Sequence, residues 1–267
     1  MTTPDRGLQP LPPPPGPATG FSTSYRVRTA DVDPQSRLRL DSVARYLQDI
    51  ANDDLEATNH ADTDPYWIVR RTVTDVIEPI TWPATVHLQR WCSAVSTRWA
   101  SMRVRLTSEP NPSALSPHRR QGGLVETEAF WIAVNEHGMP TRISPSGFAM
   151  LAAMTETHRL RWHGMTPALP TQAADPDALP DRPHVLRTTD FDPLQHLNNA
   201  AYLSAVEDEL SDHPDLRRPP YRVVIEYLRP VPPGTTVTVR RRRHGGELQM
   251  WMNADDRVAA AVTVTSS

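Results

Sequence analysis

One short stretch of the sequence, TTDFDPLQHLNNAAYL (residues 188–203), concentrates side chains that can take part in proton transfer. It places two aspartates, a histidine and two adjacent asparagines directly before an apolar run. A carboxylate can activate a water molecule or attack a carbonyl carbon itself, and a histidine can donate a hydrogen bond or a proton. The stretch is therefore suited to attack on a polarised carbonyl group.

The apolar run that follows predicts a helix, and the start of a helix can assist this chemistry. Leu203, Val206 and Leu210 recur at helical spacing, and Asn199 is suited to cap the first turn. The free N–H groups and the positive end of the helix dipole would point back at the preceding residues, where they could polarise a carbonyl oxygen. We therefore assign Asn198 and Asn199 to shaping the helix start rather than to proton transfer.

Two interpretations of the residues before the helix stay open. In the catalytic one, Asp192 is the base or the nucleophile, and His196 donates a hydrogen bond to the substrate or to the neighbouring acid. In the structural one, Asp190 and Asp192 form side-chain turns around Pro193, and His196 is a satisfied turn residue.

The same pattern occurs twice, which predicts a duplicated fold. TADVDPQSRLRLDSVARYLQDIA in the first half corresponds to TTDFDPLQHLNNAAYLSAVEDEL in the second, so that Asp33 matches Asp192. Arg37 stands in the first copy where His196 stands in the second, and an arginine cannot act as a general acid or base at neutral pH. We therefore predict one catalytic site, in the second half, and a structural role for Asp33.

Segments that alternate or carry β-branched and aromatic residues follow each copy of the pattern, as in strands. They cover residues 67–77, 84–95, 99–109 and 123–138 in the first half, and residues 221–231, 235–244, 247–256 and 257–267 in the second. Each half is therefore predicted to be an α+β unit, one long helix wrapped by an antiparallel sheet of about five strands. Two such units can join edge to edge, which removes an exposed sheet edge from each.

Composition indicates where the units begin and end. Residues 1–20 contain a polyproline run and are predicted to be a disordered tail. Residues 166–184, rich in Pro, Ala and Asp without a helical or strand period, are predicted to be a linker. The N-terminal unit then covers residues 21–165, and the C-terminal unit covers residues 185–267.

Charge and cysteine content narrow the class of protein. The formal net charge of −3 gives no reason to expect a nucleic-acid partner. The single cysteine, Cys92, excludes an intrachain disulfide, and no apolar run is long enough to cross a bilayer, so we expect a cytoplasmic protein without a membrane span. The histidines lack metal-ligand spacing, so we expect no metal. A homodimer is compatible with the sequence.

The Asp-x-Asp-Pro-x-x-His-x-Asn-Asn-x-x-Tyr pattern, the duplication and the segment WIVRRTVTDVIEPITWPATVHLQRW together resemble the acyl-carrier-protein (ACP) thioesterases of plant plastids and bacteria. The similarity runs from about residue 25 to residue 264. It implies a tandem double hotdog fold and hydrolysis of fatty acyl thioesters of ACP or coenzyme A to free fatty acids, without a cofactor. It also implies that the second hotdog carries the chemistry while the first mainly holds the acyl chain.

Two positions depart from the family pattern. Leu194 stands where the family commonly has an asparagine, and Pro230 stands where a catalytic glutamate is expected, and neither side chain can orient a water. We expect Asp192 to contribute more to catalysis than in the family pattern, and Glu226, Glu207 or Asp208 are candidate substitutes for the missing acid. The alternative function is a noncatalytic acyl or acyl-carrier binding protein with a degenerate site. Nothing marks a β-hydroxyacyl dehydratase.

Three further groups of residues invite a functional or a structural interpretation. The dense basic cluster either docks an acidic carrier protein or the phosphate of its pantetheine arm, or protects a solvated edge strand; it comprises Arg240, Arg241, Arg242 and Arg243. Cys92 is expected to be a small buried residue rather than a nucleophile. Several large apolar residues are expected in the core, with some lining an acyl tunnel: Trp67, Trp82, Trp91, Trp99, Trp131 and Met102.

Overall fold

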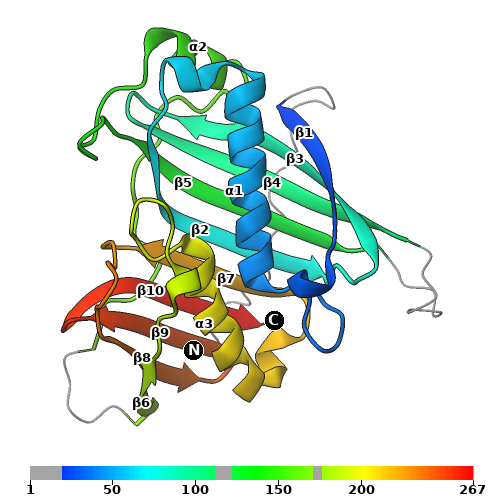
Figure 1. Ribbon diagram of the computed structural model, residues 1–267, viewed down its shortest axis with the longest axis vertical. Helices are drawn as coiled ribbons and strands as arrows, with labels where there is room; N and C mark the ends of the chain where they lie inside the picture. The colour runs from blue at the N-terminus through cyan, green and yellow to red at the C-terminus, as the bar shows by residue number, and fades with distance from the viewer. Residues whose placement is uncertain (1–19, 112–121, 171–175, 267) are drawn as a thin grey trace, which may run out of the picture.

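The computed structural model of the chain describes residues 20–111, 122–170 and 176–266, so the tail predicted for residues 1–20 lies almost wholly outside the described residues. Within them, ten strands form one antiparallel sheet in the order β1-β3-β4-β5-β2-β7-β10-β9-β8-β6 (Figure 1). The predicted α+β class is confirmed. The described residues also contain three α-helices, namely α1 (Leu40–Ala57), α2 (Pro145–Ala152) and α3 (Asn199–Asp212).

The strands fall into two sets of five, one from each half of the sequence. The first set is β1 (Phe21–Arg26), β2 (Trp67–Glu78), β3 (Ala84–Val95), β4 (Trp99–Pro110) and β5 (Leu124–Ala133). The second set is β6 (Ala178–His184), β7 (Tyr221–Tyr227), β8 (Val237–His244), β9 (Glu247–Ala254) and β10 (Arg257–Ser266). The sets join where β2 pairs with β7, so each half loses one exposed edge, as the duplicated pattern predicted.

The two strands at the outer edges of the sheet, β1 and β6, escaped the sequence analysis. β6 lies inside the stretch 166–184, where we expected a linker without regular structure. It contains Pro180 and Pro183, and proline cannot donate a hydrogen bond to a ladder, which makes such a strand hard to recognise. An edge strand tolerates proline because one side of its backbone needs no partner.

Helices α1 and α3 lie against the same face of the sheet (Figure 1). Their buried side chains, including Val43 and Ile50 of α1 and Val206 and Leu210 of α3, share one apolar core with the inward-facing strand residues. Full burial of such a side chain contributes about 1.5–3 kcal/mol, so these stripes fix both helices on the sheet. No helix in the described part of the chain is both long and apolar enough to cross a bilayer.

The short helix α2 was not predicted, because the sequence analysis expected only one long helix in each half. Ser144 caps it by accepting a hydrogen bond from the N–H of Gly147 (3.0 Å), and Pro145 occupies the first turn, where its missing N–H is not needed. Asp64 holds this cap, because its Oδ1 accepts the N–H of Ser144 (2.8 Å). Helix α2 lies beyond the C-terminal end of α1, over one end of the sheet (Figure 1).

Candidate active site

The motif forms a tight turn directly before α3. The N–H of Asp192 donates to the carbonyl oxygen of His196, and the N–H of Gln195 donates to that of Asp192, both at 2.9 Å. Oδ1 of Asp192 accepts the N–H groups of Leu194 (2.9 Å) and His196 (3.1 Å). Oδ2 of Asp192 accepts no hydrogen bond from the described residues. One carboxylate oxygen therefore builds the turn, and the other remains available for chemistry.

The first copy repeats this turn with different chemistry. Oδ1 of Asp33 accepts the N–H groups of Gln35 (2.9 Å) and Arg37 (2.8 Å). Oδ2 of Asp33, however, accepts Nε of Arg37 and Nη2 of Arg217, both at 2.9 Å. Both carboxylate oxygens are occupied, so the first copy offers no oxygen comparable to Oδ2 of Asp192.

The start of α3 presents an unused backbone donor beside the turn. Asn198, not Asn199, is the capping residue, and its Oδ1 accepts the N–H of Ala200 (2.9 Å). Asn199 is the first residue of the helix, and its N–H has no acceptor among the described residues. This N–H and the positive end of the helix dipole can stabilise negative charge on a bound oxygen.

Asp192 and His196 face different surroundings. The side chain of His196 is exposed and has no hydrogen-bond partner in the described part of the chain. Asp192 is half-buried, and its negative charge, after burial itself, raises the pKa of the buried Tyr202 above the usual range for tyrosine. Asp192 thus lies at the boundary between the core and solvent, while His196 is free to meet a substrate from solvent.

The two positions that depart from the family pattern lie beside this turn. Leu194 belongs to the turn, and its side chain is 74% exposed. The N–H of Leu197 donates to the carbonyl oxygen of Val231 (2.8 Å), which brings the exposed Pro230 next to the motif. Neither Leu194 nor Pro230 supplies a side-chain hydrogen-bonding group there.

Glu226 does not replace the missing acid, because it lies on the other face of the sheet. Val223 and Ile225 of β7 face the helices and join the main core, so Glu226 points away from α3. Its carboxylate accepts the N–H of Met165 (2.8 Å) and the hydroxyl of Thr166. Glu226 therefore anchors the segment that connects the two halves.

We expect Glu226→Ala to lower stability without reducing turnover. Removing the carboxylate takes away the acceptor of the Met165 N–H and of the Thr166 hydroxyl, and a hydrogen bond to a charged group contributes about 1.5–3 kcal/mol. Urea denaturation and a thioesterase assay on the same preparations measure both quantities. Glu226→Gln is the matched control, because an amide keeps an acceptor oxygen. A large loss of turnover at unchanged stability would show that Glu226 takes part in the reaction after all.

Glu207 and Asp208 are also too far along α3 to serve the motif. They lie eight and nine residues after Asn199, which corresponds to about 12 and 13.5 Å along the helix axis. Glu207 instead caps α1, since its Oε1 accepts the N–H of Leu40 (2.7 Å), and burial raises its pKa. Asp208 is exposed.

Each arginine of the basic cluster already has a carboxylate partner. The pairs are Arg240 with Asp181 (3.0 Å), Arg241 with Glu209 (2.7 Å), Arg242 with Asp177 (3.5 Å) and Arg243 with Asp215. The alternative of a charged edge strand is wrong, because β8 lies between β9 and β6. An acidic partner would have to compete with four intramolecular carboxylates.

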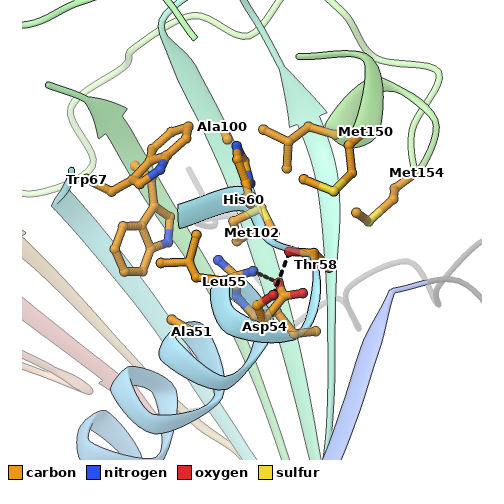
Figure 2. A pocket seen from close by; sticks show the side chains of 13 residues that line it. Ala51, Asp54, Leu55, Thr58, His60, Trp67, Ala100, Met102, Met150 and Met154 are labelled. Carbon is orange, nitrogen blue, oxygen red and sulfur yellow. Dashed lines mark hydrogen bonds and ion pairs between the residues drawn. The ribbon is translucent and has the colours of Figure 1, made fainter. Parts of the chain in front are cut away.

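An apolar cavity lies in the first half, one helical turn along α1 from the motif, and Figure 2 shows the side chains that line it. Its volume is about 40 Å³. Nε2 of Gln48 on α1 donates to Oδ1 of Asn198 (3.1 Å), and Ala51, one turn later on α1, lines the cavity. The lining includes three of the residues considered for an acyl tunnel, Trp67, Trp131 and Met102, together with Met150 and Met154 beside them. Trp82, Trp91 and Trp99 do not line it.

The same cavity contains polar residues that the sequence analysis missed, namely Asp54, His60 and Arg90. A signal was present for Arg90, because strand alternation places it on the same face as Leu88 and Cys92. Cys92 is fully buried, and burial raises the pKa of its thiol to about 12, as suits a structural residue. No cluster of three or more His, Cys, Asp or Glu suited to a metal ion occurs among the described residues.

Comparison with family models identifies the family of the chain. Residues 18–149 match the family model of the acyl-ACP thioesterase N-terminal domain, and residues 176–264 match that of the C-terminal domain. The chain is 39% identical over 248 residues to an uncharacterised protein of Mycobacterium tuberculosis, found in strains CDC 1551 / Oshkosh and ATCC 25618 / H37Rv. That alignment covers 92% of this chain and 92% of the relative.

Two solved structures are similar over nearly their whole length. The 12:0-ACP thioesterase from Umbellularia californica matches with a TM-score of 0.66 and 16% identity, over 92% of this chain and 96% of that one. An acyl-ACP thioesterase from Bacteroides thetaiotaomicron matches with a TM-score of 0.69 and 13% identity, over the same shares. At these identities the likeness establishes a common fold.

Proposed function

Because the chain belongs to the acyl-ACP thioesterase family, we propose that it hydrolyses fatty acyl thioesters of ACP or coenzyme A to free fatty acids. In this proposal each half is one hotdog unit, α1 and α3 being the two wrapped helices. The observation that carries it is the turn before α3, which leaves Oδ2 of Asp192 without a partner among the described residues, beside the unused N–H of Asn199. An apolar cavity opens one helical turn away.

Asp192 and the start of α3 have complementary roles in this reaction. Oδ2 of Asp192 takes a proton from a water molecule, whose oxygen attacks the thioester carbon. The N–H of Asn199 and the helix dipole stabilise the oxyanion that forms. The carbon–sulfur bond then breaks, the leaving thiolate takes the proton back from Asp192, and the fatty acid remains. His196, exposed beside the turn, donates a hydrogen bond to the substrate carbonyl oxygen.

The acyl chain would lie in the cavity of the first half. The cavity holds a few water molecules but not an acyl chain, so its flexible methionines, Met102, Met150 and Met154, must move when a chain enters. The apolar lining then supplies about 0.8 kcal/mol for each methylene group buried. Chain-length preference would therefore be set by the residues of α1, α2 and the inner sheet face rather than by the motif.

We expect Met154→Trp to shift the enzyme towards shorter acyl chains. The larger, stiffer side chain occupies space that the acyl chain needs, and each methylene group excluded lowers kcat/KM by about fourfold. Steady-state kinetics on a series of acyl chain lengths measures the shift. Met139→Trp is the control, since Met139 is 62% exposed and lies outside the cavity lining. An equal loss for all lengths would contradict this placement of the chain.

We also propose that the protein is cytoplasmic. Its single cysteine, Cys92, is buried and can form no intrachain disulfide, which suits a reducing compartment. Docking of an acidic carrier on Arg240 to Arg243 would require the carrier to displace their intramolecular carboxylate partners.

Free-thiol release from a panel of acyl-ACP and acyl-CoA thioesters tests the proposal. Turnover by the full chain, with a preference for one carrier, is the expected result and identifies the substrate class. A folded protein that releases no thiol from any member of the panel would refute hydrolysis.

A noncatalytic acyl-binding protein is the second candidate. The specific observation in its favour is that Leu194 and Pro230 leave the motif without the amide and the second acid of the family pattern. Such a protein would bind acyl chains in the same cavity and show no turnover in the panel.

A further inference from the structure

The cavity in the first half combines an apolar lining with an ion pair. Asp54 of α1, labelled in Figure 2, forms an ion pair with Arg90 of β3, which also lines the cavity. The two side chains are only 13% and 11% exposed. Leu55 and Met102 are among the apolar side chains around them. A plain hydrocarbon chain in this cavity would strip water from the pair without replacing its hydrogen bonds, which costs free energy.

Both members of the ion pair keep unused hydrogen-bonding capacity. Nη1 of Arg90 donates to Oδ2 of Asp54, while the described residues provide no acceptor for the other N–H groups of Arg90 and no donor to Oδ1 of Asp54. Trp131 lines the same cavity, and its Nε1 is buried without a partner among the described residues. The cavity therefore contains several polar groups that a ligand oxygen could satisfy.

Stability alone does not account for an ion pair at this place. Replacing a buried ion pair by apolar residues of similar volume is often neutral or stabilising. The neighbouring core at this end of the sheet is apolar, with Cys92, Ala100 and Leu151 among its buried residues. A ligand that bonds to the pair gives a physical reason for its position.

We propose that the cavity accepts a fatty acyl chain that carries a hydroxyl group, and that this hydroxyl binds to Asp54 and Arg90. Its oxygen accepts an N–H of Arg90, and its hydrogen is donated to Oδ1 of Asp54. A ketone could only accept, and a carboxylate would add a second negative charge beside Asp54. This inference rests on the proposed function, because it specifies the substrate class of the same site.

The position of the ion pair determines which carbon carries the hydroxyl. Gln48 contacts Asn198 at the start of α3, and Asp54 lies six residues further along α1. This separation corresponds to about 9 Å along the helix axis. The hydroxyl therefore lies in the middle or the distal part of the chain, and a hydroxyl on carbon 3, next to the thioester, does not reach the pair.

Binding of uncleavable ligands tests this inference without relying on catalysis. Calorimetry on the full chain would compare decanamide with the amides of 3-, 8- and 10-hydroxydecanoic acid, which contain no thioester and no charge near Asp192. A distal hydroxyl is expected to tighten binding by about tenfold or more over decanamide, as for a hydrogen bond to a charged group. The 3-hydroxy compound is expected to show no gain.

The double variant Asp54→Leu/Arg90→Met removes both charges of the pair, so that neither charge is left buried alone. We expect it to lose the preference for a distal hydroxyl and to bind decanamide more tightly than the wild type does. The control, Arg103→Met/Glu128→Leu, removes a pair (2.9 Å) on the opposite sheet face and should keep the preference. Equal binding of all four amides to the wild type, no binding at all, or a preference that survives in the double variant would overturn the inference. The wild-type comparison decides even if the double variant does not fold.

The two proposals can fail separately. Thiol release in the panel together with equal binding of plain and hydroxylated chains would remove the hydroxyacyl inference and keep the thioesterase. A hydroxyl preference without any thiol release would keep the cavity assignment and refute hydrolysis.

Discussion

Asp192→Asn is expected to lower kcat for thioester hydrolysis by about 10²- to 10⁴-fold while leaving the fold intact. Two side chains of the turn can take a proton from water, the carboxylate of Asp192 and the exposed imidazole of His196. Asparagine keeps the oxygen that accepts the N–H groups of Leu194 and His196, because it forms the same kind of side-chain turn. The substitution thus removes charge and basicity, not shape.

Single-turnover kinetics and thermal denaturation of the same variant separate the two roles of Asp192. A large loss of rate at nearly unchanged Tm is the result that the catalytic role requires. Asp192→Ala provides the contrast, since it also removes the acceptor and is expected to lose both rate and stability. Full turnover in Asp192→Asn would exclude Asp192 as base or nucleophile and would leave it a turn residue only.

Asp33→Ala is expected to destabilise the protein by about 3–5 kcal/mol, because it breaks a buried ion-pair network between the two halves. Oδ2 of Asp33 accepts Nη2 of Arg217, which also pairs with Glu207 (3.0 Å). The other oxygen of Glu207 caps α1 at Leu40. Arg217 is only 13% exposed, so the loss of Asp33 leaves a largely buried charge with fewer partners.

Urea denaturation measures this loss, and the folded fraction should still turn over substrate, since Oδ2 of Asp192 and the start of α3 are untouched. Asp215→Ala is the matched control. Asp215 belongs to the same short 3₁₀ segment as Arg217 (Pro214–Arg217), but its pair with Arg243 is exposed, so its loss should cost less than about 1 kcal/mol. Loss of turnover in a fully folded Asp33→Ala protein would disprove the one-site interpretation.

Local signals were enough to predict most of the fold. The period of apolar residues indicated α1 and α3, and alternation indicated eight of the ten strands within the described residues. The repeated Asp-x-Asp-Pro pattern indicated the two turns, which share their backbone hydrogen bonds and a left-handed residue, Ser36 in one copy and Gln195 in the other. The edge strands β1 and β6 and the eight-residue α2 are short and polar or proline-containing, so their periodic signal is weak.

The candidate site likewise has features that the sequence predicted and features that it did not. The sequence by itself determined that Asp192, His196 and the asparagine pair would meet at a helix start, because these residues lie within eight positions of each other and form one turn. Only the tertiary structure decided that Glu226 faces away from α3, that each arginine of the basic cluster has an acidic partner, and that Asp54 and Arg90 meet inside the cavity. Those contacts join residues 28 to 65 positions apart, so they depend on strand register and on how the helices lie on the sheet, which no local pattern specifies.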